Sequence, residues 1–237
     1  MSATLTGVLG PQGPIEDSAL TATDYSNFEK FETMPPNEVI KWAIDNFGED
    51  VVLAASFQDC VLVDVVTRVA PDIEVVFIDT GSHFKETLNY VDDIRARYDL
   101  RLVRLKPGYE AAKFPCGTDG CCEMKKVKPF DEFLKKNNVK AWISGIKRVD
   151  TAERNNAPVV GIDQARGIVK INPIVRWSDD DVESYSKLRN LPVHPMTAKG
   201  YLSIGCAPTT KPVELGSSPR SGRWSDQEKT ECGLHLS

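Results

Sequence analysis

The stretch VVLAASFQDCVLVDVVTRVA, residues 51–70, sets the pattern for the whole chain. VVLAAS (51–56) is a short apolar run that is typical of a buried strand, and CVLVDVVTRVA (60–70) is an apolar run long enough for a helix. A strand followed by a helix begins a βαβ unit, in which the next strand returns parallel to the first. The stretch therefore predicts an α/β fold.

The same alternation extends in both directions. NEVIKWAIDNFG (37–48) has apolar residues at helical spacing behind Asn37 and stops at Gly48. The elements predicted after residue 70 are a strand and turn at 74–81, a helix at 83–98, a strand at 100–105, a basic helix near 125–137 and a strand at 141–147. Strands that alternate with such helices imply right-handed crossovers, so the sheet should be mostly parallel and sandwiched between helices.

Three regions divide the chain. Residues 1–36 are rich in Thr, Ser, Pro and Gly without periodicity and are interpreted as an N-terminal extension. Residues 37–190 are the α/β domain, which ends with two short strands around a turn (158–174) and a helix with Ser178 as its N-cap (178–190). Residues 191–237 contain repeated prolines and predict a long, mobile C-terminal tail without regular structure.

Composition limits the classes of function. A formal net charge of −5 argues against general nucleic-acid binding, so an anionic ligand must be met by local basic patches. Neither a signal-peptide pattern nor an apolar run of membrane-spanning length occurs, and we expect a cytoplasmic protein without a membrane anchor. In that compartment the six cysteines should be reduced, metal-binding or catalytic rather than disulfide-bonded. The oligomeric state stays open, with a homo-oligomer as one alternative.

Polar residues follow three of the predicted strands. Ser56–Asp59 follows the first strand, Asp79–His83 the second, and Lys147, Arg148 and Arg154 lie after the fourth. The carboxyl ends of parallel strands meet at one edge of the sheet, where ligands bind in open α/β folds. Their convergence predicts a site for an anion, most naturally a nucleotide.

Two cysteine features stand apart from this pattern. Cys121 and Cys122 are adjacent and stand beside a cluster of lysines, and Cys232 lies near the end of the chain with His235. Cys232 fits two interpretations equally well from its residues alone. It is either an accidental surface thiol or a nucleophile on a mobile arm, with Arg220 and Arg223 nearby in SPRSGRW favouring the thiolate. Cys60, within the predicted apolar helix, is expected in the core.

The motifs together resemble those of the sulfonucleotide reductases, and in particular the bacterial adenylyl-sulfate reductases. The resemblance runs from about residue 37 to the C-terminus. It rests on SFQD (56–59), DTGSHFKET (79–87), CCEMKKVKP (121–129), GIKRVDTAER (145–154), GYLSIGCAP (200–208), SPRSGRW (218–224) and ECGLH (231–235). ECGLH and the double cysteine are the specific signals, whereas DTG and the basic loop are weak alone.

The resemblance implies an adenine nucleotide alpha-hydrolase-like fold, related to the ATP pyrophosphatases. In place of the glycine-rich pyrophosphatase loop stands SFQD, as suits an enzyme that does not cleave ATP. The family reaction begins when a C-terminal cysteine attacks the sulfur of adenylyl sulfate. That attack releases AMP and leaves an S-sulfocysteine, from which thioredoxin or a similar dithiol then releases sulfite, a step of sulfate assimilation and cysteine biosynthesis.

The resemblance also implies roles for individual residues. Cys232 matches the nucleophile, His235 the histidine near it, and Lys126 the lysine that links the cysteine pair to the substrate's charged end. The residues expected at the substrate are Ser56 and Gln58 in the phosphate loop, Thr80 and Gly81 in the nucleotide pocket, Lys147 and Arg148 in the basic loop, and Arg220 and Arg223 closing over the phosphosulfate. Basic donors around the sulfate oxygens reduce the repulsion that an attacking thiolate would meet.

One departure from the family pattern concerns the iron–sulfur cluster. Members that reduce adenylyl sulfate hold a [4Fe–4S] cluster with the double cysteine and a later Cys-x-x-Cys, which here reduces to Cys206 and Thr209. The fourth ligand is then the Thr209 oxygen, a water or the thiolate of Cys116. A three-iron cluster, no cluster, and an altered residue at 209 are further alternatives. Zinc fits poorly, because adjacent cysteines rarely meet on one ion, and two plain core thiols are a further weak interpretation.

The retained cysteines bear on the substrate. Because Cys121, Cys122 and Cys206 are present, adenylyl sulfate is the expected substrate, and its 3′-phosphorylated form (PAPS) is the nearest alternative. An ATP-consuming adenylating enzyme would need a glycine-rich loop where Ser56–Asp59 stands. An iron–sulfur redox sensor on the same scaffold would give no reason to keep ECGLH.

Overall fold

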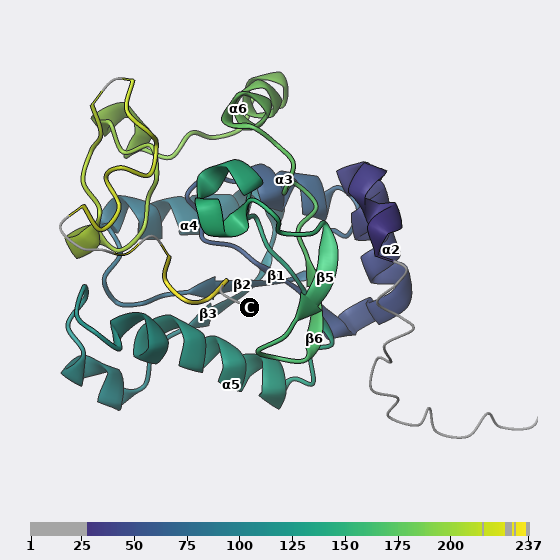
Figure 1. The fold of residues 1–237 in the computed structure, drawn as a ribbon, viewed down its shortest axis with the longest axis horizontal. Coiled ribbons are helices and arrows are strands. Elements are labelled where there is room, and N and C mark those ends of the chain that lie inside the picture. Colours follow the sequence, from purple (N-terminus) through teal and green to yellow (C-terminus); the bar gives the residue numbers. More distant parts are fainter. Residues whose placement is uncertain (1–27, 215, 226–228, 230, 236–237) are drawn as a thin grey trace, which may run out of the picture.

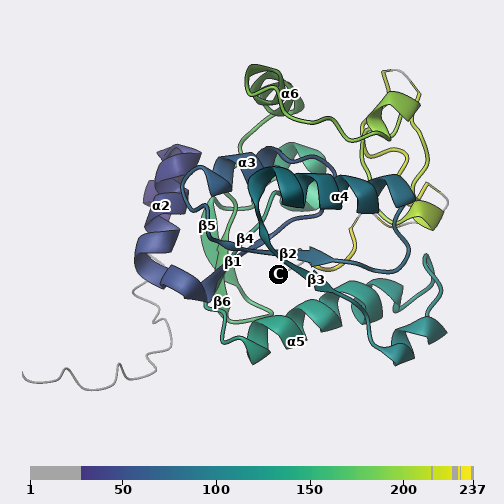
Figure 2. The same ribbon diagram turned by 180° about the vertical axis from the view of Figure 1, so that it is seen from behind.

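The computed structural model describes residues 28–214, 216–225, 229 and 231–235. Its centre is a six-stranded sheet with the order β3-β2-β1-β4-β6-β5 (Figures 1 and 2). Neighbouring strands are parallel, except that β5 runs antiparallel to β6. The strands are β1 (Val51–Ala54), β2 (Glu74–Ile78), β3 (Arg101–Leu105), β4 (Ala141–Ile143), β5 (Val160–Asp163) and β6 (Ile168–Ile171).

Helices cover both faces of this sheet, as Figures 1 and 2 show from opposite sides. α2, α3 and α4 pack on one face with α6 beyond them, and α5 packs on the other. The predicted α/β class with a mostly parallel sheet between helices is confirmed. The helices are α2 (Pro36–Phe47), α3 (Val61–Thr67), α4 (Lys85–Tyr98), α5 (Lys128–Lys136) and α6 (Asp179–Leu188).

Side chains on the two faces of β1 pack into two separate hydrophobic cores. Successive side chains of a strand point to opposite faces, so Val51 and Leu53 enter the large core beneath α2, α3 and α4. Val52 faces the other way and packs in the smaller α5-face core with Phe130 and Trp142. Because both faces are buried, the strand is apolar throughout rather than alternating, which is why the sequence shows a continuous apolar run.

Some element boundaries differ from the predicted ones for local reasons. α2 begins at Pro36 rather than behind Asn37. Proline is tolerated at this position because N–H groups in the first turn of a helix have no partner within the helix, so the missing N–H costs nothing. The basic helix predicted near 125–137 starts as a π-helix over Glu123–Val127 and continues as α5. Cys60 precedes α3 instead of lying inside it. Ser178 is the N-cap of α6, as predicted.

The N-terminal extension predicted over 1–36 lies largely outside the described residues. Its described part, from residue 28, packs onto the α/β domain through the fully buried Phe31 and through a short 3₁₀ helix, Glu29–Thr33. The Glu32 carboxylate accepts from the Val159 N–H and forms an ion pair with Arg148 at 2.8 Å. The boundary at residue 36 stays a prediction.

The described part of the C-terminal tail lies over the edge where the parallel strands end (Figure 1). It contains two short 3₁₀ helices, Thr197–Lys199 and Ala207–Thr209, and neither an α-helix nor a full strand among its described residues. Although irregular, it is well packed, since Met196, Trp224 and Leu234 are buried. Within the described ranges of the chain, no helix has the length and apolar character needed to cross a membrane.

Buried His194 fastens the start of this tail to α4. Its Nδ1 accepts from the Met196 N–H at 3.1 Å, so Nε2 carries the proton and donates to the Thr87 hydroxyl at 3.1 Å. Burial lowers the pKa of His194 to about 4. Protonation of Nδ1 would remove the acceptor of the Met196 N–H.

The α5-face core should be essential for stability. Phe130→Ala, at a fully buried ring packed on Trp142, should cost about 3–5 kcal/mol of unfolding free energy. The measurement is urea denaturation followed by circular dichroism. Tyr109→Ala is the control, because an aromatic side chain that is 89% exposed should contribute less than about 0.5 kcal/mol. Equal midpoints for the two variants would contradict this packing.

His194 should make stability depend on pH. Its pKa is about 4 in the folded state and near 6.5 unfolded, so the unfolded chain binds the proton first as pH falls. Stability should therefore drop by about 1–3 kcal/mol between pH 6.5 and pH 4. His194→Gln does not titrate, and its urea midpoint should vary less over this window. Parallel pH profiles for the two proteins would refute the assignment.

Candidate active site

A cavity of about 240 Å³ lies at the carboxyl ends of β1, β2 and β4 and is bordered by the tail. A single water needs only about 10–15 Å³ of such space, so this cavity accommodates a small-molecule ligand. It opens between β1 and β4, where connections leave the sheet in opposite directions, which is the usual ligand position in doubly wound folds. The predicted location of the site is therefore matched by a real cavity.

The loop after β1 forms the floor of this cavity. Phe57 takes a left-handed conformation with φ of 54°, and its ring is buried edge-on against Phe77. Such a conformation is unfavourable for a bulky residue and is kept only where packing enforces it, often at functional sites. On either side of Phe57, Ser56 and Gln58 line the cavity, as predicted. The Gln58 side-chain oxygen accepts from the Ile204 N–H at 3.1 Å, so it also holds the tail.

The loop after β4 contributes positive charge that is already paired. The Lys147 ammonium group lines the cavity and forms ion pairs with Asp150 and Asp179. Arg148, also predicted here, is not brought to the cavity. Its guanidinium group turns away and pairs with Glu32, because the chain enters a 3₁₀ helix at Arg148–Asp150 that sends successive side chains in different directions.

Arg154, which the sequence analysis named in the same loop, does line the cavity. It forms a two-point ion pair with the buried Glu231, with Arg154 Nε 2.6 Å and Nη2 2.8 Å from the carboxylate oxygens. It also donates to Asp150 at 2.8 Å. Its position near the end of GIKRVDTAER was visible in the sequence, but its partner Glu231 is 77 residues further along and only the fold brings them together.

Arg220 and Arg223 line the cavity from the tail. Arg223 is stacked on the Trp224 ring at 4.5 Å, and its buried Nε has no hydrogen-bond partner in the structure. Burial lowers the pKa of Arg223, with the nearby Arg220 charge as the next cause. Its guanidinium group crosses so close to Gly205 that an added Cβ there would lie 2.2 Å from Nη2. Any side chain at 205 would therefore force the Arg223 guanidinium group to leave this position.

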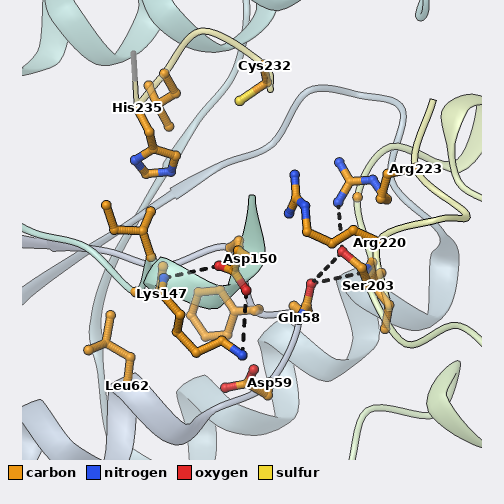
Figure 3. Close-up of a pocket in the computed structure, with 18 of the residues that line it drawn as sticks. Gln58, Asp59, Leu62, Lys147, Asp150, Ser203, Arg220, Arg223, Cys232 and His235 are labelled. Atoms are coloured by element: carbon orange, nitrogen blue, oxygen red, sulfur yellow. Dashed lines mark hydrogen bonds and ion pairs between the residues drawn. The ribbon is translucent and has the colours of Figure 1, made fainter. Parts of the chain in front are cut away.

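Cys232 and His235 enter the cavity from the end of the chain. In Figure 3 they approach from one side, with Gln58, Asp59 and Lys147 on the other. Cys232 is half-buried against the α5-face core. The His235 ring stacks on Trp142 at 5.6 Å, and its buried Nδ1 has no partner. Burial, followed by the Lys170 charge, puts the pKa of His235 well below its usual value, so the ring is neutral.

A second, smaller cavity is lined by most of the cysteines other than Cys232. Cys116, Cys121, Cys122 and Cys206 line it together with Thr209. The neighbouring Cys116 thiol and the Lys126 charge lower the pKa of Cys206 to about 4, while Cys206 and burial raise the pKa of Cys116. Among the described residues, no three His, Cys, Asp or Glu side chains are arranged for a single metal ion.

Lys126 lines both cavities. Burial alone would lower its pKa, but the sulfur atoms of Cys232, Cys206 and Cys122 outweigh burial and raise it. The ammonium group therefore stays charged between the cysteine cavity and the larger cavity. This is the position that the resemblance implied for it.

Thr80 and Gly81 do not line the larger cavity, where they were expected. The Thr80 hydroxyl lies in the cysteine cavity, 3.4 Å from the Cys206 sulfur. Gly81, with φ of 68°, forms the turn beyond β2 and lines neither cavity. That turn brings the chain beside Cys206, through a bridge between His83 and Cys206. Thr80 therefore faces the cysteines, and His83 lines the larger cavity instead.

Comparison with known proteins settles the family. The model of the phosphoadenosine phosphosulfate reductase domain matches residues 50–212, which is more than half of the chain. The chain belongs to this reductase family. The matched range covers β1 to the 3₁₀ helix at Ala207–Thr209, and so includes the cavity floor and all four residues Cys116, Cys121, Cys122 and Cys206.

Relatives of this reductase extend the match to most of the chain. Adenosine 5′-phosphosulfate reductase of Mycolicibacterium smegmatis is 42% identical over 210 residues, covering 84% of this chain and 88% of that protein. The protein of the same name from Mycobacterium tuberculosis is 36% identical and covers 97% and 94%, respectively. These matches show an enzyme family that acts on a sulfonucleotide sulfur.

Solved structures agree with the fold. The crystal structure of phosphoadenylyl-sulfate reductase from Candida auris, a phosphate complex, superimposes with a TM-score of 0.71 at 25% identity and covers 82% of this chain and 99% of that one. FMN adenylyltransferase from Candida glabrata superimposes with a TM-score of 0.59 at 16% identity, over 82% and 77%. The second likeness concerns the fold alone.

The Arg154–Glu231 ion pair should hold Cys232 in place. Glu231→Gln removes the carboxylate from a buried pair, a change that typically costs about 3–5 kcal/mol. We expect the C-terminal segment to detach locally and Cys232 to be alkylated by iodoacetamide at least about tenfold faster, with global unfolding less affected.

The matched control is Glu183→Gln, at a solvent-exposed pair with Lys187 on α6. It should leave the alkylation rate unchanged, because an exposed pair contributes little. An unchanged rate in Glu231→Gln as well would show that the tail is held by other contacts.

Proposed function

We propose that this protein reduces adenylyl sulfate to sulfite and AMP, with electrons from thioredoxin or a similar dithiol. The observation that carries the proposal is the meeting of Cys232 with Arg220, Arg223 and Lys126 around one cavity. A thiol is thereby set among cations on a sheet edge suited to nucleotides. The names of relatives at 36–42% identity support the same substrate.

The chemistry begins at the Cys232 sulfur. Its thiolate attacks the sulfate sulfur of adenylyl sulfate, and the bond from that sulfur to the bridging oxygen breaks, so the phosphate of AMP takes the electron pair. The product on the protein is S-sulfocysteine. A thiolate of the dithiol then attacks the Cys232 sulfur and expels sulfite. Its second thiol resolves the mixed disulfide, which leaves an oxidised dithiol and a free Cys232.

The cations around the cavity lower the barrier to this attack. A thiolate and a sulfate group repel one another, and fixed donors in a site shielded from water counter this repulsion far better than solvent does. Arg223 supplies a buried Nε without a protein partner, and an anionic oxygen would satisfy it. Lys126 offers a second charge on the side of the cysteines. Lys147 and Arg154 are engaged by carboxylates and are assigned to positioning.

His235 and Trp142 form an apolar wall beside Cys232. The imidazole is neutral and stacked, so it adds no charge to the site, and its unpartnered Nδ1 is available to a ligand oxygen. Leu234 is buried in the α5-face core and limits water entry along this side. Exclusion of water prevents hydrolysis of the activated sulfur.

We further propose that the cysteine cavity is the site of a [4Fe–4S] cluster. A four-iron cluster binds one thiolate per iron, and four thiols line this cavity. When bound, the cluster would supply a fixed charged group beside Lys126. Lys126 and Lys229, whose ammonium lies 3.3 Å from the Cys122 sulfur, offset the charge of the thiolates.

We also place the protein in the cytoplasm and keep PAPS as the second candidate substrate. All six cysteines are free in the structure, which suits a reducing compartment. PAPS is kept as the second candidate because the solved structure of a PAPS reductase is similar at 25% identity. Sulfite release measured side by side with the two nucleotides decides between them.

Cys232→Ser should abolish turnover and spare binding. Sulfite release from adenylyl sulfate with thioredoxin should fall on the order of 10³-fold or more, as expected when a nucleophile is removed. AMP affinity by calorimetry should change less than about threefold, because the charged groups remain. Without dithiol, the wild-type C-terminal peptide should gain one sulfonate group by mass spectrometry.

The matched control is Cys60→Ala, at a buried thiol that faces the Pro192 carbonyl at the far end of the β1 loop. It should keep turnover within a few-fold of wild type. Turnover that survives in Cys232→Ser would sink the proposed mechanism.

A further inference from the structure

The cluster proposed above lacks one cysteine of its family pattern. Position 209, where the second cysteine of Cys-x-x-Cys is expected, is Thr. Thr209 does line the cysteine cavity, but its hydroxyl is directed back to the Cys206 carbonyl at 3.4 Å, within its own 3₁₀ turn. A neutral hydroxyl is also a poor ligand for iron that is otherwise bound by thiolates. The remaining chain must then provide the fourth thiolate or leave one iron without it.

Cys116 is the only additional thiol among the described residues that lines this cavity. It shares the cavity wall with Cys121, Cys122 and Cys206. It therefore lies beside the three cysteines that match the family pattern. Cys60, by contrast, lies on the opposite face of the sheet in the large core.

The loop that carries Cys116 is built to hold this position. The Thr118 hydroxyl donates to the Pro115 carbonyl at 2.8 Å, and the Cys121 N–H donates to the Thr118 carbonyl at 3.2 Å, so the loop turns directly into the helical run. Gly120 has φ of 72°, and a Cβ there would lie 2.9 Å from the Phe114 ring. Packing of Phe114 on this glycine folds the loop back over the thiols.

The surroundings favour thiolates at these positions. Cys121 and Cys122 stand in the first turn of a helical run that continues into α5, where the N–H groups carry partial positive charge. Lys126 lines the cavity, and Lys229 donates to Cys122. The four thiols come from three separate segments, at 116, 121–122 and 206. They can therefore approach a cluster from different directions.

We propose that Cys116 supplies the fourth thiolate of the cluster, which is then held by Cys116, Cys121, Cys122 and Cys206, and that Thr209 is not a ligand. The loss of the cysteine at 209 is compensated by a cysteine on the facing loop. This inference rests on the proposed cluster, but it does not depend on the identity of the sulfonucleotide.

The test compares the full-length protein with four variants, all purified anaerobically. The variants are Cys116→Ser, Thr209→Ala, the double variant Cys116→Ser with Thr209→Cys, and Cys60→Ser as the matched thiol control. The readouts are iron and acid-labile sulfide per chain, Mössbauer spectra, and electron paramagnetic resonance after oxidation. Circular dichroism verifies that each variant is folded.

Wild type, Thr209→Ala and Cys60→Ser should each hold about four irons per chain with the same spectra. Cys116→Ser should lose at least one iron in four and give the resonance of a three-iron cluster, or lose the cluster entirely. Restoring cysteine at 209 in the double variant should bring the iron content back to about four. This rescue distinguishes a lost ligand from a misfolded loop.

Three results would overturn the assignment. They are a Cys116→Ser protein with four irons and wild-type spectra, a Thr209→Ala protein that loses iron, and a wild-type protein that holds no iron and has a Cys116–Cys206 disulfide by mass spectrometry. Sulfite release is measured separately. If the ligand pattern holds without sulfite release, the proposed reaction fails and this inference stands, whereas the reverse combination rejects only the inference.

Discussion

The buried ion pair between Arg154 and Glu231 is the constraint on which the site depends. Glu231 is 4% exposed at its side chain and Arg154 11%, so separating them would remove the closest opposite charge from two groups that are shielded from water. The pair joins the loop after β4 to the end of the chain. Cys232 is the next residue, and the pair thus fixes where the thiol can reach. Leu234 and His235 then complete the docking through the α5-face core and Trp142.

A single helical run couples this docking to the cysteines. Its α5 part is anchored to the sheet by Phe130 and Leu134. Its first turn holds Cys121 and Cys122. The π-helix that follows, before α5, places Lys126 where it borders both cavities. π-Helical turns are uncommon and are frequent at functional sites, since they shift one side chain out of the regular register. The same packing that stabilises α5 therefore sets the distance between the thiols and the substrate cavity.

Sequence reasoning succeeded where the signal is local. The strand and helix order follows from apolar periodicity, and the loops after β1 and β4 were expected at one edge because parallel strands end together. One cavity is indeed lined by the expected residues Ser56, Gln58, Lys126, Lys147, Arg220, Arg223, Cys232 and His235. Sequence reasoning failed where the direction of a single side chain within a turn decides whether a residue faces the cavity. Arg148 and Arg154 are both basic and lie in one loop, but only the 3₁₀ turns at 148–154 determine which side chain faces inward.

The sequence by itself determined the fold class and the family, because these depend on composition, periodicity and short motifs. It also left Cys116 as one of several candidates for the missing ligand. Only the tertiary structure shows that Cys116 and Cys206, 90 residues apart in the chain, line one cavity. It also shows that the Thr80 hydroxyl lies beside the Cys206 sulfur and that Glu231 pairs with Arg154. Such contacts arise from how the sheet edge, α5 and the tail close on one another, and no local pattern specifies the order in which distant segments meet.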